Sequence, residues 1–331
     1  MRSEFTRLRA GIALLLALAL SLGVVACGSS SDNNSTSGSS EEVATGSSLV
    51  TNPKNAKISL TIGSKNFPEQ EILGEIYAQA LKAVGYKVKT DLNLGSETVA
   101  HEAVKNGTIS GYPEYASTAL TSFFGFEPEE VPANANAAYE LAHDEFETEG
   151  LVAFPPTPFA SANAVGTTKK FAEEEGLKTV SDLKGKSESM TLYGSPECRQ
   201  RIDCLAGLEK YYGLKFKAFH PVDIGLRYTV LEKGQADLSI LFTTDPQLAA
   251  EKDKFVILED DKHVFPAGNV IFVTKLSTFE KAGHDYESTI LQVQTGLTLE
   301  VMQELDARVE LEKQTPKEAA AAYLKSAGYV R

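Results

Sequence analysis

The sequence predicts an α/β protein of two lobes, in which each lobe is a mostly parallel sheet flanked by helices and a cleft separates the lobes. Apolar runs typical of strands alternate along the chain with apolar positions at helical spacing, and this alternation indicates βαβ units. Two segments rich in proline and turn residues, 154–159 and 263–269, indicate crossings between lobes. Because the chain crosses twice, we expect lobe 2 (160–266) to be inserted into lobe 1 (57–159 plus 267–331).

In the first lobe, short apolar runs predict the strands and apolar stripes predict the helices. The run 58–62 predicts a strand. The apolar positions from Ile72 to Val84 predict a helix that starts at Pro68, because proline lacks the N–H that a first helical turn leaves unpaired. Alternation over 86–94 predicts a second strand, and Ser96 and Gly107 suit the start and the end of the next helix. A strand at 109–112 and a helix at 135–149 follow.

Beyond the first crossing, the same alternation continues in shorter elements. Strands are expected at 189–193, 216–222, 236–243 and 255–258, and helices at 180–183, 203–212 and 224–233. After the second crossing, a strand at 270–274 is followed by helices at 278–297, 299–311 and 316–327.

The first 26 residues have the pattern of a bacterial lipoprotein signal peptide. Arg2, Arg7 and Arg9 form a basic region, and the apolar run 12–22 is short for a membrane span. Small residues then precede Cys27, which fits cleavage that leaves Cys27 as the lipidated first residue. The alternative is an ordinary signal peptide followed by an incidental cysteine.

Residues 27–56 predict a flexible tether. This segment is rich in Ser, Gly, Asn and Thr and poor in apolar residues, so it cannot bury a core. We therefore expect a protein held by lipid on the extracytoplasmic face of the cell membrane.

The composition favours a binding protein over an enzyme. The formal net charge of −13 argues against nucleic acid as a partner. The five histidines are scattered, and no nucleophile motif, phosphate-binding glycine loop or metal-ligand spacing is found. We expect no cofactor and no metal, and a monomer.

Cys198 and Cys204 are the two cysteines left once Cys27 carries lipid. A pair six positions apart in an exported protein favours a disulfide that closes a small loop, with two free thiols as the alternative.

The loop 63–70 joins the first strand to the first helix and carries Lys65. Ligands of open α/β sheets bind beyond the carboxyl ends of strands, so Lys65 is a candidate ligand-binding cation, and a solvated loop lysine is the alternative. Arg201 is a second candidate cation, expected on the other side of the cleft.

Three motifs resemble the glycine betaine/carnitine/choline substrate-binding proteins of ABC importers. They are Ile-Gly-Ser-Lys-Asn-Phe-Pro-Glu-Gln at 62–70, Leu-Asn-Leu-Gly at 92–95 and Gly-Tyr-Pro-Glu-Tyr at 111–115. Gly-Leu-Arg-Tyr at 225–228 and Thr-Asp at 244–245 fit the same family. The resemblance covers residues 57–328 and implies a two-lobed periplasmic-binding-protein fold of type II.

The resemblance also implies a ligand site. A carboxylate would be held by Lys65, Thr118 and Arg201, and an ammonium group would lie in a box of tyrosines of which Tyr115 is the first. At the other three box positions this chain has Asn163, Phe242 and Gly268. The ligand-binding residues predicted from the sequence are therefore Lys65, Tyr115, Thr118, Asn163, Arg201 and Phe242.

The function implied is capture of a small osmoprotectant-like solute by lobe closure and its delivery to a membrane permease. Because the tyrosine box is depleted, a larger polar or aromatic cargo is an alternative, which Asn163 and space at Gly268 would admit. A secreted enzyme and a structural lipoprotein are more remote alternatives.

Overall fold

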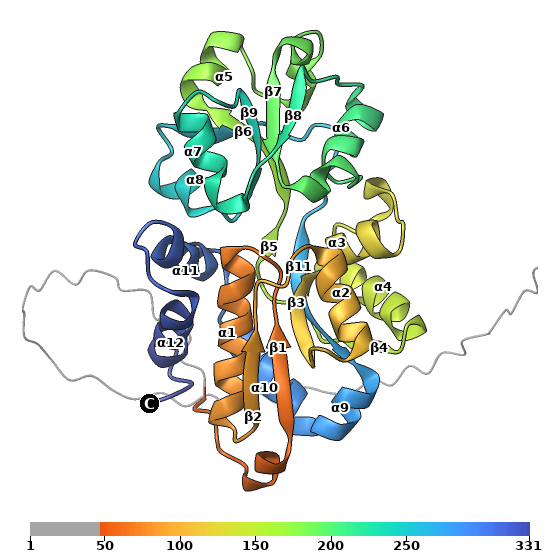
Figure 1. Cartoon of the computed structure of the whole chain (residues 1–331), viewed down its shortest axis with the longest axis vertical. Coiled ribbons are helices and arrows are strands. Elements are labelled where there is room, and N and C mark those ends of the chain that lie inside the picture. The colour runs from red at the N-terminus through yellow and green to blue at the C-terminus, as the bar shows by residue number, and fades with distance from the viewer. Residues whose placement is uncertain (1–46) are drawn as a thin grey trace, which may run out of the picture. The chain divides into compact units, whose positions relative to one another are not determined.

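The computed structural model describes residues 47–331 and shows two sheets, each with its own helices (Figure 1). The signal peptide, Cys27 and most of the expected tether lie outside these residues. One sheet has six strands in the order β2-β1-β3-β11-β4, with β5 paired to β11. The other has five strands in the order β10-β6-β9-β7-β8. The two-lobed α/β prediction is confirmed.

Lobe 1 contains both termini of the described chain. Its strands are β1 (Ser59–Gly63), β2 (Lys87–Asp91), β3 (Gly111–Tyr115), β4 (Leu151–Ala153), β5 (Ala160–Ser161) and β11 (Gly268–Lys275). Its helices are α1 (Pro68–Ala83), α2 (Glu97–Asn106), α3 (Ala116–Thr118), α4 (Ala135–Thr148), α9 (Leu276–Ala282), α10 (His284–Gln294), α11 (Leu299–Glu310) and α12 (Pro316–Ser326).

Lobe 2 is built from the middle of the chain. Its strands are β6 (Asn163–Thr168), β7 (Thr191–Gly194), β8 (Ala218–Pro221), β9 (Leu238–Phe242) and β10 (Phe255–Ile257). Its helices are α5 (Lys169–Glu175), α6 (Leu205–Tyr212), α7 (Arg227–Glu232) and α8 (Pro246–Ala250). The short helix expected at 180–183 is a 3-10 turn.

The sheets are mixed, whereas the sequence predicted mostly parallel ones. Strand β1 runs parallel to β2 and β3, and β7 runs parallel to β8 and β9. Strands β6 and β11 instead run antiparallel to every partner they have. Each of these two strands enters its lobe directly from a crossing, without the crossover helix that a parallel connection requires.

Further differences concern individual elements. Strands β4, β5 and β6 and helices α5 and α8 were not predicted; in β6, Gly166 interrupts the apolar run and packs directly against Leu241. The helix expected over 278–297 is broken into α9 and α10 at Gly283, where φ is +81°.

The folded chain also begins before the predicted end of the tether. Leu49 donates its N–H to the carbonyl of Tyr329, and Asn52 donates to the carbonyl of Val84. Asn52 also caps a 3-10 turn, Pro53–Lys57. Polar residues that suggested a tether are thus used as backbone partners and as a cap.

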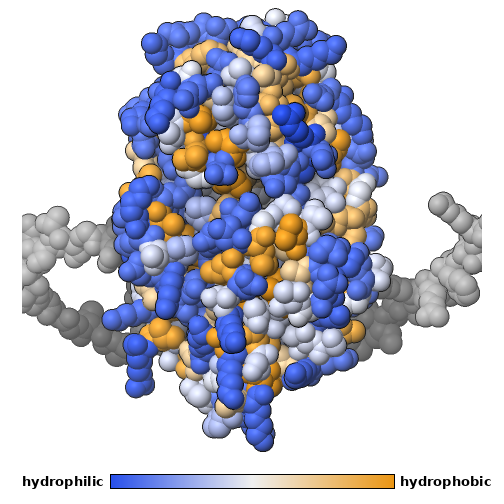
Figure 2. All heavy atoms as spheres, in the orientation of Figure 1, coloured by the Kyte–Doolittle hydropathy of each residue, from blue (hydrophilic) through white to orange (hydrophobic). Residues whose placement is uncertain are grey.

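Helix α1 forms the centre of the lobe 1 core. Ile72, Leu73, Ile76, Tyr77 and Leu81 are fully buried along it. Pro68 occupies its first turn, as the sequence predicted. Outside the core, Figure 2 shows a largely polar face in which apolar residues form separate small groups.

We predict that Gly111→Ala destabilises lobe 1. An added Cβ at Gly111 would lie 2.4 Å from a ring carbon of Phe272 and 2.8 Å from the carbonyl oxygen of Val273. Such overpacking costs about 1–3 kcal/mol, which urea unfolding would show as a lower midpoint. Gly225→Ala is the control, because no atom lies within 4 Å of the added group. Equal stability of the two variants would contradict the packing argument.

Candidate ligand-binding site

A cavity lies between the two lobes, at the carboxyl ends of four strands. Strands β1, β3, β7 and β9 end at its edge, as expected for ligand sites of α/β sheets. All six residues predicted from the sequence line this cavity: Lys65, Tyr115 and Thr118 from lobe 1, and Asn163, Arg201 and Phe242 from lobe 2. The folding of distant segments thus brings together the side chains that the sequence singled out.

Lys65 is buried and paired, so it is not a solvated loop lysine. Its side chain forms an ion pair with Glu114, which is fully buried in β3. The ammonium group also lies 4.5 Å from the ring centroid of Tyr115 and 5.7 Å from that of Phe67. The sequence predicted the cation but not the carboxylate beside it.

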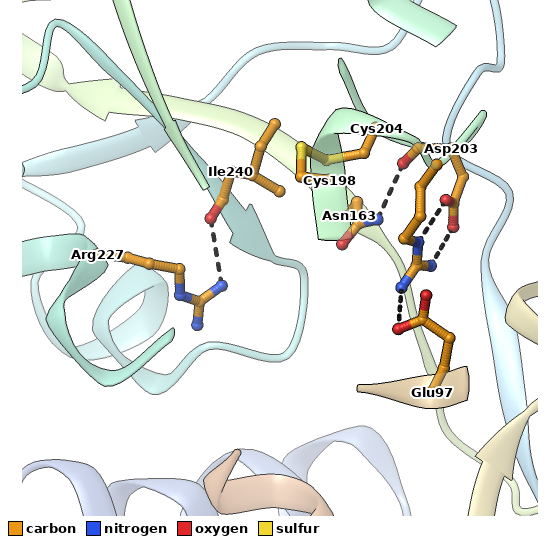
Figure 3. Close-up of a disulfide and its surroundings, with 8 residues drawn as sticks. Glu97, Asn163, Cys198, Asp203, Cys204, Arg227 and Ile240 are labelled. Atoms are coloured by element: carbon orange, nitrogen blue, oxygen red, sulfur yellow. Dashed lines mark hydrogen bonds and ion pairs between the residues drawn. A yellow bond between two sulfur atoms is a disulfide. The ribbon is translucent and has the colours of Figure 1, made fainter. Parts of the chain in front are cut away.

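Arg201 reaches from lobe 2 to lobe 1. Its Nε donates to Asp203 Oδ1 at 2.8 Å, and its Nη2 also donates to the Asp203 carboxylate. Across the cleft, Nη2 donates to Thr118 Oγ1 at 3.3 Å. Nη1 lies 3.7 Å from Glu97 Oε2 (Figure 3). Asp203 and Glu97 were missed by sequence reasoning, although both line the cavity.

Asn163 and Phe242 face each other in the register of β6 and β9. The amide nitrogen of Asn163 donates to the backbone carbonyl of Asp203 at 2.9 Å. The ring of Phe242 lies 5.3 Å from that of Phe67 and 4.1 Å from the guanidinium of Arg227. Phe67 also lines the cavity, and the sequence analysis missed it because it considered only the four positions of the tyrosine box.

Arg227 lines the cavity and belongs to a buried polar group. Its Nη2 donates to Asp245 Oδ1 at 2.7 Å, and both side chains are almost fully buried. Asp245 also accepts hydrogen bonds from Tyr228 Oη at 3.0 Å and from the N–H of Phe242 at 2.8 Å. This network holds the end of β9 and the ring of Phe242 in place.

Gly268 does not open space for a larger ligand, which corrects the sequence-based expectation. A Cβ at this position would lie 2.2 Å from Ser117 Oγ and 2.9 Å from Ser117 N. The first turn after β3 occupies the volume where the resemblance expected a tyrosine, and Gly268 is absent from the cavity lining.

Two buried carboxyl groups, Glu69 and Asp306, lie beside the site. Glu69, in the first turn of α1, accepts a hydrogen bond from Tyr115 Oη, and Asp306 of α11 is buried near enough to feel the charge of Glu69. Burial raises the pKa of both carboxyl groups, and the charge of Glu69 raises the pKa of Asp306 further. Folding therefore favours the protonated form of each carboxyl group relative to the unfolded chain.

Cys198 and Cys204 form a disulfide. Both cysteines are buried, and the ring that they close contains Arg201 and Asp203. The disulfide therefore lies at the base of the loop that carries Arg201 (Figure 3).

Within residues 47–331, no cluster of three or more His, Cys, Asp or Glu side chains is arranged to hold a metal ion. In the same part of the chain, the helices are too short or too polar to span a bilayer.

Residues 58–326 match the family model described as the substrate-binding domain of the ABC-type glycine betaine transport system. The chain belongs to this family. It is a substrate-binding component of an ABC importer, and its relatives work outside the cytoplasm. The expected periplasmic-binding-protein fold of type II is confirmed by similarity to solved members.

Three comparisons show the range of the relatives. A glycine-betaine-binding protein of Pseudomonas aeruginosa is 34% identical over 279 residues, which span 80% of this chain and 87% of that protein. A Helicobacter pylori protein named ergothioneine transport permease/ergothioneine binding protein is 29% identical over 83% of this chain and 49% of its own length. A crystal structure of a glycine betaine/carnitine/choline ABC transporter has a TM-score of 0.62 and 26% identity, over 80% of this chain and 97% of that one.

We predict that Asp306→Asn stabilises the protein more at pH 8 than at pH 5. A carboxyl group whose pKa is raised by folding contributes stability below its unfolded pKa of about 4, and this contribution is lost as the pH rises. An amide does not ionise, so the variant escapes this loss. Melting temperatures at the two pH values measure the effect, with the exposed Glu304→Gln on α11 as control. An equal shift at both pH values would refute the assignment.

Proposed function

We propose that this protein is a lipid-anchored extracytoplasmic receptor that captures a small quaternary ammonium osmolyte of the glycine betaine, choline or carnitine type. The lobes close over the solute, and the closed form delivers it to a membrane permease. The proposal assigns ligand contacts to Lys65, Tyr115, Thr118, Asn163, Arg201 and Phe242. It assigns a binding role only, with no catalysis and no cofactor.

The observation that carries the proposal is a cavity with aromatic rings and cations in a chain of this family. Phe67, Tyr115 and Phe242 supply rings. An ammonium group would gain about 0.5–2 kcal/mol from each ring face that Lys65 and Arg227 leave open. Thr118 and Arg201 lie on the polar side, where the solute's oxygen atoms would bind. Lys65 uses one of its three N–H donors on Glu114, which leaves donors for the solute.

Lobe closure is supported by contacts that join the lobes on opposite sides of the cavity. On one side, Lys210 Nζ of lobe 2 lies 2.7 Å from Glu127 Oε1 of lobe 1. On the other side, Gln247 Nε2 of lobe 2 donates to Glu310 Oε2 of lobe 1 at 2.9 Å. Polar contacts of this kind form and break with little net change in free energy, which suits a reversible hinge.

A larger aromatic cargo is the second candidate. The relative named as an ergothioneine-binding protein supports it, as does Asn163 at a position where the resemblance expects a tyrosine. An enzyme or a structural lipoprotein has no comparable support.

The binding proposal predicts that Arg201→Ala weakens the protein's affinity for glycine betaine or choline by about 10- to 100-fold, because charge-assisted hydrogen bonds are lost. Arg308→Ala is the control, since Arg308 pairs with Glu304 on α11 and lies outside the cavity lining. Affinities would come from titration calorimetry on the mature protein. At 100 times its dissociation constant, a true ligand should also stabilise the fold by about 2.7 kcal/mol. Equal affinities of both variants would exclude Arg201 from the site, whereas stabilisation by ergothioneine alone would favour the second candidate.

The anchoring proposal predicts that Cys27→Ser moves the protein from the membrane fraction to the soluble fraction, because the thiol that would carry lipid is lost. Immunoblots of fractionated cells measure this. A protein that stays with the membrane fraction would contradict lipid attachment at Cys27.

A further inference from the structure

The segment 195–205 is here named the cysteine loop. It belongs to lobe 2 and carries Arg201, whose side chain reaches across the cavity to Thr118 of lobe 1. It leaves the end of β7, forms a 3-10 turn at Pro196–Arg199 and leads into α6 at Leu205. Arg201 lies near its tip. The position of the Arg201 guanidinium therefore depends on how firmly this loop is held.

The loop has few backbone ties to the rest of lobe 2. The hydrogen bonds Cys198 N to Ser195 O, Gln200 N to Glu197 O and Cys204 N to Arg201 O all lie within the loop itself. No strand pairs with it, since β7 ends at Gly194. Backbone hydrogen bonding alone thus shapes turns in the loop without fixing the loop to a sheet.

Four other contacts fix the loop in place. Arg199 Nη2 donates to the carbonyl of Phe219 in β8 at 3.0 Å. The Cys198–Cys204 disulfide joins its two ends, with both sulfur-bearing residues buried in the lobe 2 core. Asn163 of β6 donates to the carbonyl of Asp203 at 2.9 Å. Ile202 packs so closely on α6 that its carbonyl oxygen lies 1.8 Å from where a Cβ of Gly207 would be. Only glycine allows this approach.

These anchors lie on either side of Arg201. Asn163 holds the backbone of Asp203, the Asp203 carboxylate holds the Arg201 guanidinium, and the disulfide closes the ring around both residues (Figure 3). A polar side chain at position 163 therefore has a specific partner in this chain. The replacement of an expected tyrosine by Asn163 and the presence of two cysteines belong to one structural unit.

We propose that the Cys198–Cys204 disulfide, together with Asn163, is a positioning element of the ligand site, which preorganises Arg201 for the solute and for its contacts with lobe 1. This inference rests on the proposed function for its effect on affinity. Holding a ligand-binding group in its bound geometry lowers the entropy that binding must overcome. The disulfide thus acts on affinity through Arg201, in addition to any effect on stability.

A double-mutant cycle tests the proposal with glycine betaine as the probe. The pair Cys198→Ser/Cys204→Ser is combined with Arg201→Ala, and affinities are measured by titration calorimetry. In the Arg201 background we expect the disulfide's removal to weaken binding about tenfold. In the Arg201→Ala background we expect a change below about twofold, because the group being positioned is already gone. Equal effects in both backgrounds, or unchanged binding, would overturn the proposal.

A control separates positioning from loss of stability. Val180→Ala removes volume from the same core of lobe 2 but lies outside the cysteine loop. It should lower the melting temperature without weakening glycine betaine binding. If it weakens binding as much as the loss of the disulfide does, the effect is one of general destabilisation and the proposal fails.

A measurement without ligand decides the question even if glycine betaine does not bind. Hydrogen exchange of the amides at 197–204 should become faster in the Cys198→Ser/Cys204→Ser protein and stay unchanged in Val180→Ala. Unchanged exchange in the cysteine variant would overturn the proposal. Absence of glycine betaine binding in the wild type, with faster exchange in the variant, would instead count against the proposed ligand and support the positioning role.

Discussion

Two buried cations and one half-buried cation surround the cleft, and each has a carboxylate beside it. Lys65 pairs with Glu114, Arg201 with Asp203, and Arg227 with Asp245. A buried charge that loses its partner costs about 3–5 kcal/mol. The ends of β1, β3 and β9 and the cysteine loop must therefore stay in register for the cavity to exist.

The ion pairs also shape the aromatic side of the site. The ammonium of Lys65 lies over Tyr115, and the guanidinium of Arg227 lies over Phe242. Each of these two cations thus packs on an aromatic ring and also neutralises a carboxylate. A solute that enters this cavity meets cations that are already paired with carboxylates, so its affinity depends on donors and ring faces that remain directed into the cavity.

Apart from the aromatic contact between Phe67 and Phe242, polar contacts join the lobes, whereas each lobe is held by its own apolar core. Apolar clusters with residues of α1 and α10 in lobe 1, and of β7 and α6 in lobe 2, contain most of the fully buried side chains. Between the lobes, Lys210, Gln247 and Arg201 make charged or polar contacts with lobe 1. Apolar burial gives each lobe its stability, and the weaker contacts leave the angle between lobes adjustable.

Most elements could be derived from the sequence, because apolar periodicity is a local signal. The six residues that line the cavity were predicted from the resemblance of their motifs to those of a known family. The antiparallel β6 and β11 could not be derived, since strand direction depends on where the chain re-enters each lobe. The partners Glu114, Asp203 and Glu97 were missed for a similar reason. An Asp or Glu in the sequence looks the same whether its carboxylate is solvated or buried and paired. Only the folded structure shows which of the two it is.

The sequence by itself determined the fold class, the family resemblance, the cysteine pair and the cations Lys65 and Arg201. Those features follow from residue type and spacing along the chain. Only the tertiary structure decided that Lys65 is paired with a carboxylate, that Ser117 occupies the space beside Gly268, and that Asn163 holds the loop carrying Arg201. These facts depend on which distant segments are packed against one another, and no local pattern encodes that.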